Sequence, residues 1–195
     1  MKIYPVIKDS LDSIYNGLLA THPNRDEAIW AAFTHLEDKY YNPVGTTVDY
    51  SAPATQFAYL FKFAGSRACA VYSRHSYRRI SDLYTKDALT VTNLGGGPGS
   101  DLLGIFRFYI EQNLQIKLHI NLVDVDATWK EIAKIVKSAA CNRLNGCPLP
   151  TVAFKELDCS AATIMESLQE YDQTDLFTLS YLLSEMDADS GTRLL

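Results

Sequence analysis

The chain has 195 residues, which is long enough for one sizeable hydrophobic core, or for a core domain with a small appendage. Hydrophobic residues make up 47% of the sequence and charged residues 21%, which is ordinary for a globular protein. The net charge of −5 excludes an overall attraction for nucleic acid and leaves a local basic patch as the means to bind it.

Targeting and metal-binding signals are absent from the sequence pattern. The N-terminus has no apolar run of signal-peptide type, and no later stretch is apolar over the length that a bilayer crossing needs. The cysteines are scattered, with no Cys-x-x-Cys pair and no histidine at zinc-ligand spacing: Cys69, Cys141, Cys147 and Cys159. We therefore expect reduced thiols, no metal site, no membrane contact, and a cytoplasmic or nuclear location.

Residues 1–86 predict a helical N-terminal region, because apolar residues recur there at helical spacing. Asp9 or Ser10 is placed to cap the first helix. A third helix is expected to stop near Gly65, and a fourth to run over residues 67–84. We expect this region to form a lid over a ligand cleft or a platform for a substrate.

The pattern changes at residue 87, where short apolar strands begin to alternate with helices. Such alternation predicts right-handed crossovers and a mostly parallel sheet with helices on both faces. The expected strands are 89–94, 118–123, 151–155 and 176–183, and the helices between them are about 100–113, 126–144 and 161–171. Residues 87–195 are therefore expected to form an α/β domain, an αβα sandwich.

A glycine-rich loop, Gly95-Gly96-Gly97-Pro98-Gly99, joins the first of these strands to the helix that begins near Ser100. Glycines permit positive φ and, without a Cβ, let a ligand approach the backbone closely. The helix start adds unpaired N–H groups and a positive dipole end. Dinucleotide enzymes use the spacing G-x-G-x-x-G, and the spacing G-x-G-x-G found here disfavours a nicotinamide-dependent oxidoreductase. Taken alone, such a loop is usually an ordinary turn.

Acidic residues follow the next two strands. Asp124 ends the second strand, and Asp158 comes after the third. The carboxyl ends of parallel strands meet at one edge of a sheet, where open α/β sheets bind ligands. A solvated strand-end carboxylate and a helix cap are the alternative readings of Asp124 and Asp158. Asp126 is expected to cap the helix after the second strand.

Together, the segment Asn93–Gly99, Asp124 and Asp158 resemble the cofactor motifs of class I S-adenosylmethionine-dependent methyltransferases. The resemblance implies a Rossmann-like fold over residues 88 to about 186, with S-adenosylmethionine as cofactor. It implies that Asp124 bridges the ribose hydroxyls and that Asp158 accepts a hydrogen bond from the adenine amino group. The residues that it places at the cofactor are Asn93, Gly95, Gly96, Gly97, Pro98, Gly99, Asp101, Asp124, Asp158 and Cys159.

The sequence departs from the family pattern in two places. Asn93 stands where the family has an acidic residue, and Asp101, just inside the following helix, is placed to compensate. The family's sheet has seven strands, and the sequence after the fourth expected strand is too short for the last three. We expect that strand to be a sheet edge, open to a second copy or a partner chain. A fragment, a natural short form and a subunit completed by another chain all stay open as explanations.

The catalytic residues are unknown, and the candidates follow the fourth strand. Tyr181 and Glu185 occupy the place where many family members contact substrate, with Glu185 as a candidate base. A buried aromatic residue and a helix-start carboxylate are the alternatives. Two functions stay open: a methyltransferase acting on RNA, protein or a small molecule, and a catalytically inactive, methyltransferase-like interaction protein. The intact glycine loop favours the first, and Asn93 with the short C-terminal part favours the second.

Two further features have two readings each. Trp129, early in the helix after the second strand, either packs on the adenine or ribose or belongs to the core. The basic stretch from Arg74 to Arg79 either meets RNA phosphates or forms a solvated helix face.

Overall fold

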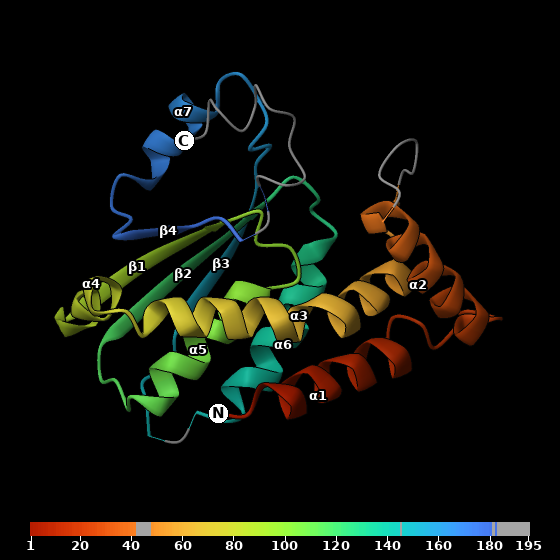
Figure 1. Ribbon diagram of the computed structural model, residues 1–195, viewed down its shortest axis with the longest axis horizontal. Helices are drawn as coiled ribbons and strands as arrows, with labels where there is room; N and C mark the ends of the chain where they lie inside the picture. Colours follow the sequence, from red (N-terminus) through yellow and green to blue (C-terminus); the bar gives the residue numbers. More distant parts are fainter. Residues whose placement is uncertain (42–47, 145, 181, 183–195) are drawn as a thin grey trace.

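The computed structural model describes residues 1–41, 48–144, 146–180 and 182. Within these residues the sheet has four parallel strands in the order β3-β2-β1-β4. Helices α5 and α6 connect β1 to β2 and β2 to β3, and α7 with the 3-10 helix η2 connects β3 to β4 (Figure 1). This confirms the expected Rossmann-like α/β fold. The elements are β1 (Ala88–Leu94), α5 (Ser100–Glu111), β2 (Lys117–Asp124), α6 (Trp129–Cys141), β3 (Thr151–Glu156), α7 (Ile164–Ser167), η2 (Leu168–Tyr171) and β4 (Leu176–Thr178).

Helices come before the sheet, as expected. In Figure 1, α1 and α3 lie on the same side of the sheet as α5 and α6, and α7 lies on the other side. α3 packs along α5, and α1 packs along α3 and α6, so these helices and the sheet share one hydrophobic core. The N-terminal elements are α1 (Ile3–Asn16), α2 (Arg25–Tyr41), α3 (Pro53–His75), α4 (Arg78–Ser81) and the 3-10 helix η1 (Asp82–Thr85).

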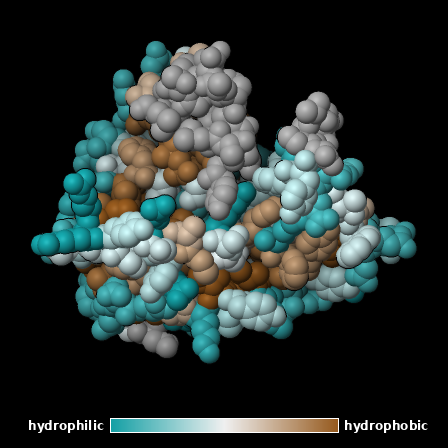
Figure 2. Space-filling view, in the orientation of Figure 1, coloured by the Kyte–Doolittle hydropathy of each residue, from teal (hydrophilic) through white to brown (hydrophobic). Residues whose placement is uncertain are grey.

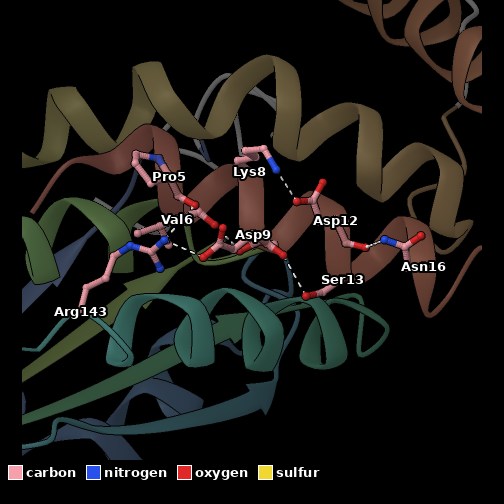
Figure 3. Close-up of polar contacts among 9 residues, drawn as sticks. Pro5, Val6, Lys8, Asp9, Asp12, Ser13, Asn16 and Arg143 are labelled. Carbon is pink, nitrogen blue, oxygen red and sulfur yellow. Dashed lines mark hydrogen bonds and ion pairs between the residues drawn. The ribbon is translucent and has the colours of Figure 1, made fainter.

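The first helix begins earlier than the sequence predicts. α1 starts at Ile3, and Pro5 fits its first turn because backbone N–H groups there have no partner within the helix. Asp9 therefore lies inside the helix and does not cap it. Its carboxylate accepts a hydrogen bond from the Arg143 guanidinium, 2.6 Å away, and Arg143 also donates to the Pro5 carbonyl (Figure 3). Ser10 is buried and its hydroxyl donates to the Val6 carbonyl.

The third helix is longer than predicted. α3 continues through Gly65 to His75, where a stop near Gly65 and a new helix over 67–84 were expected. Ala64 and Ala68 on either side of Gly65 are fully buried, so packing of this stripe holds the helix together across the glycine. α3 therefore runs as one continuous helix from Pro53 to His75 and packs along α5.

The two faces of the sheet are covered unequally. Alternate residues of β1 and β2 (Leu89, Val91, Leu118, Ile120 and Leu122) are buried in the main core with α5 and α6. The other face has a small cluster at the carboxyl end of the strands, in which Leu94 and Val123 pack with Ile164 and Tyr171. β4 is shorter than the predicted strand and pairs with β1 alone in the described part of the chain. No described helix is both long and apolar enough to cross a bilayer.

Candidate ligand-binding site

A cavity of about 340 Å³ opens at the carboxyl ends of the four strands. The chain leaves β1 toward β2 on one side, and β4 lies on the other side, so the cavity sits at the point where the strand order reverses. Its volume lies in the usual range for small-molecule sites. The lining comes from the segments after all four strands, from α3 and the segment before it, and from the first residue of α6: Tyr50, Tyr59, Arg67, Gly95, Gly97, Asp124, Val125, Asp126, Trp129, Leu157, Asp158, Cys159, Ser160, Ser180 and Leu182.

The glycine loop has the backbone geometry that its composition predicts. Gly95, Gly97 and Gly99 have φ values of 65°, 45° and 87°, in the left-handed region that favours glycine. Gly95 and Gly97 line the cavity. Gly96 donates through its N–H to the Val123 carbonyl, 2.9 Å away, which ties the loop to the end of β2. Pro98 and Gly99 complete the turn without lining the cavity.

Asp124 joins the glycine loop to the second strand. Its Oδ2 accepts a hydrogen bond from the Gly97 N–H at 2.8 Å, and its Oδ1 accepts one from the Asp126 N–H at 3.1 Å. An ionised carboxylate has about four lone-pair directions, so it can accept from ligand hydroxyls as well. Asp126 accepts hydrogen bonds from the N–H and hydroxyl of Thr128, which is itself the N-cap residue of α6. The prediction that Asp126 caps this helix is therefore wrong, because α6 begins two residues later than a cap at Asp126 requires and has no side-chain cap hydrogen bond.

The residues after β3 form another wall of the cavity. The Asp158 carboxylate accepts hydrogen bonds from the Ser160 hydroxyl and N–H, which hold the pKa of Asp158 below its usual value and keep it an acceptor. Cys159 is buried, and burial raises the pKa of its thiol to about 11, which disfavours the thiolate form at neutral pH. Val125 also lines the cavity, leaves 59% of its surface exposed and offers an apolar side chain to a ligand.

Asn93 and Asp101 lie behind the loop and do not line the cavity. The Asn93 amide donates to the Thr178 hydroxyl at 2.6 Å, and that hydroxyl donates to Asp101 at 2.8 Å. These two hydrogen bonds link β1, β4 and α5. Burial raises the pKa of Asp101, while its bonds from Thr178 and Ser180 act in the opposite direction. Among the residues that the structure describes, the buried Asn93 Oδ1 and Ser100 hydroxyl have no hydrogen-bond partner.

The sequence predicts a lid or platform from the N-terminal region but does not single out the residues of that region that line the cavity. Tyr50, Tyr59 and Arg67 line the cavity from α3 and the segment before it. Tyr59 and Tyr50 pack against Trp129, with ring centroids 5.3 and 6.2 Å away. Trp129 is 4% exposed and belongs to the main core, and it also lines the cavity. Its packing on an adenine or ribose stays a prediction. The signal that could have revealed Arg67 is an arginine inside the apolar stripe of a helix.

Other predicted residues lie elsewhere. Tyr181 and Glu185 fall outside the described residues, although Ser180 and Leu182 on either side of Tyr181 line the cavity. The basic stretch from Arg74 to Arg79 lies around α4, at the amino ends of the strands and away from the cavity. Its side chains are exposed apart from the buried His75, and this end of the molecule is hydrophilic in Figure 2, as expected of a solvated surface.

Comparison with known proteins does not extend this description. The sequence matches no protein-family model, and no curated protein is similar to it. In the part of the chain that the structure describes, no three His, Cys, Asp or Glu side chains gather to hold a metal ion. The chain is therefore an α/β protein with a Rossmann-like sheet and a ligand-sized cavity where its strand order reverses.

Proposed function

We propose that this chain binds S-adenosylmethionine and transfers its methyl group to an acceptor. The observation that carries the proposal is the hydrogen bond between Asp124 and the Gly97 N–H, 2.8 Å long, at the cavity wall. This bond holds the carboxylate at the end of β2 next to the glycine loop. A ligand with ribose hydroxyls and a charged amino-acid end needs both, the carboxylate for the hydroxyls and the loop for the amino-acid end.

Each part of such a ligand has matching residues in the cavity. Asp124 accepts hydrogen bonds from the two ribose hydroxyls, which an acceptor-only carboxylate does well. Asp158 accepts from the adenine amino group, and Val125 and Leu157 supply apolar contact to the ring. Gly95 and Gly97 leave room for the sulfonium and the amino-acid chain, because neither has a Cβ.

Methyl transfer requires the protein mainly to align the acceptor atom with the methyl group and to exclude water from the site. The cofactor supplies an activated methyl group, and transfer depends on alignment and desolvation of the acceptor atom. Tyr50, Tyr59 and Trp129 form an aromatic wall that excludes water from one side of the cavity. Tyr181 and Glu185 stay candidates for contact with the acceptor.

Calorimetric titration with S-adenosylmethionine and S-adenosylhomocysteine tests the proposal. The unaltered chain is expected to bind both, and Asp124→Ala to weaken binding about 10- to 100-fold, because charge-assisted hydrogen bonds are lost. Asp124→Asn keeps the shape and removes the charge. Asp87→Ala is the matched control, since Asp87 is an exposed aspartate before β1, at the opposite end of the sheet. Equal affinity in the Asp124 and Asp87 variants would refute the proposal.

A second candidate function is a catalytically inactive protein that keeps the cofactor cavity and works by interaction. Asn93 favours it, because its side chain bonds to Thr178 within the fold and does not line the cavity. Formation of S-adenosylhomocysteine in the presence of RNA, protein and small-molecule acceptors separates the two. Turnover that Asp124→Ala abolishes would support the enzyme, and cofactor binding without turnover would support the inactive form.

A further inference from the structure

Arg67 places a buried cation in the wall of the cavity. It lies on α3, 14 residues after the helix begins at Pro53, and is 7% exposed. Charged side chains are rarely buried to this extent, because the loss of hydration is costly unless an opposite charge or hydrogen bonds replace the water. A buried cation that faces a ligand-sized cavity is therefore a candidate for binding a ligand anion.

Neighbouring side chains hold the guanidinium in one orientation. Arg67 donates hydrogen bonds to the hydroxyls of Tyr59 and Tyr40. Its Cζ lies 4.8 Å from the centre of the Tyr59 ring and 5.3 Å from that of Phe63. These contacts fix the side chain before a ligand arrives. A guanidinium has five N–H donors in a planar fork, a geometry that matches a carboxylate.

Two positive contributions come together near the start of α5, the Arg67 guanidinium and the N-terminus of that helix. Burial raises the pKa of Asp101 at the start of α5, and the charge of Arg67 acts in the opposite direction, so the guanidinium lies within electrostatic reach of that helix start. The N-terminus of α5 adds its positive dipole end behind Gly95 and Gly97. Asp124 and Asp158, which suit neutral donors, line the cavity through the ends of β2 and β3.

We propose that Arg67 binds the carboxylate of the ligand's amino-acid end, so that the cavity selects adenosyl compounds that carry this carboxylate over those that lack it. The inference rests on the proposed function and adds a ligand-selecting residue from the N-terminal region. It also gives that region a role in cofactor binding, in addition to any contact with the acceptor.

The unaltered chain provides the first test, because it needs no substitution at a buried position. Binding of S-adenosylmethionine is compared with that of its decarboxylated form, and binding of S-adenosylhomocysteine with that of 5′-methylthioadenosine. The carboxylate-bearing member of each pair is expected to bind about 10- to 100-fold more tightly. Equal affinities within both pairs would overturn the role of Arg67 and leave adenosyl binding intact. Failure of all four compounds to bind would instead overturn the proposed function itself, and the inference with it.

Substitutions of Arg67 then test whether this side chain causes the preference for carboxylate-bearing compounds. Arg67→Gln is expected to lose the preference while its affinity for 5′-methylthioadenosine stays unchanged, and Arg67→Lys to keep part of it. Arg107→Gln is the matched control, because Arg107 also stacks on a tyrosine, 3.9 Å from the centre of the Tyr72 ring, but does not line the cavity. If Arg67→Gln does not fold, Arg67→Lys and the four-compound comparison decide. An equal loss of affinity for every compound in the Arg67 variants would mean that Arg67 shapes the cavity and does not select the carboxylate.

Discussion

Replacement of Gly104 by alanine is expected to destabilise the contact between α3 and α5. A Cβ at Gly104 would lie 2.6 Å from the Ala68 carbonyl oxygen and 2.8 and 2.9 Å from the Cβ and Cγ1 of Val71. The carbonyl belongs to the backbone of a helix and has no rotamer by which to move away. The two helices must therefore separate to admit one methyl group.

The size of the effect follows from two opposing terms. Alanine in place of glycine inside a helix stabilises by about 1 kcal/mol. Overpacking of a tight core costs about 1–3 kcal/mol, and we expect the upper part of this range because a backbone atom is the obstacle. The net loss in the free energy of unfolding is about 1–2 kcal/mol. Gly65→Ala is the matched control, since a Cβ there meets only Ile7 Cδ1, at an ordinary 3.6 Å, and the helix gain of up to about 1 kcal/mol remains.

Urea unfolding measures the difference in the free energy of unfolding between the two variants, provided that their m-values are equal. Gly65→Ala should unfold at higher urea than the unaltered chain, and Gly104→Ala at lower urea. The reasoning is refuted if Gly104→Ala is as stable as Gly65→Ala. Because Ala68 follows Arg67 on α3, Gly104→Ala is also expected to weaken ligand binding, which titration of the folded variant checks.

Three further results are expected. Burial lowers the pKa of His75 from 6.5 to about 4, so between these pH values the unfolded chain binds a proton that the folded chain excludes. The free energy of unfolding is therefore expected to fall by about 3 kcal/mol as the pH drops from 6.5 to 4. Urea unfolding at several pH values measures this, and His75→Gln should flatten that part of the profile. Asp158→Ala should weaken S-adenosylhomocysteine binding about tenfold and remove any preference for adenine over hypoxanthine in the ligand, which competition with the inosine analogue measures. Trp30→Phe leaves Trp129 as the sole tryptophan, and ligand binding should change its fluorescence; a saturated complex with unchanged emission would contradict its place in the lining.

The parallel sheet was predictable because its strands follow simple patterns. The strands expected at 89–94, 118–123 and 151–155 match β1, β2 and β3 within one residue at each end, since apolar runs bounded by turn residues mark buried strands. Glycine spacing likewise predicted the left-handed turns at Gly95, Gly97 and Gly99. Local chemistry determines these features, so the sequence alone reveals them.

The helices were less predictable because tertiary contacts determine their ends. Gly65 is a helix breaker by propensity, but α3 continues through it since buried alanines flank it. The predicted helix 161–171 consists of the short α7 and η2. Arg67 shows the same limit at the site: its place in the cavity wall depends on the packing of α3 along α5, which no local pattern encodes.

A crystal structure of the chain with S-adenosylhomocysteine tests the central claim most directly. The account predicts both ribose hydroxyls within about 3 Å of the Asp124 carboxylate, the adenine amino group beside Asp158, and the ligand carboxylate at Arg67. An adenosyl ligand bound elsewhere, or bound here with its ribose away from Asp124, would contradict it.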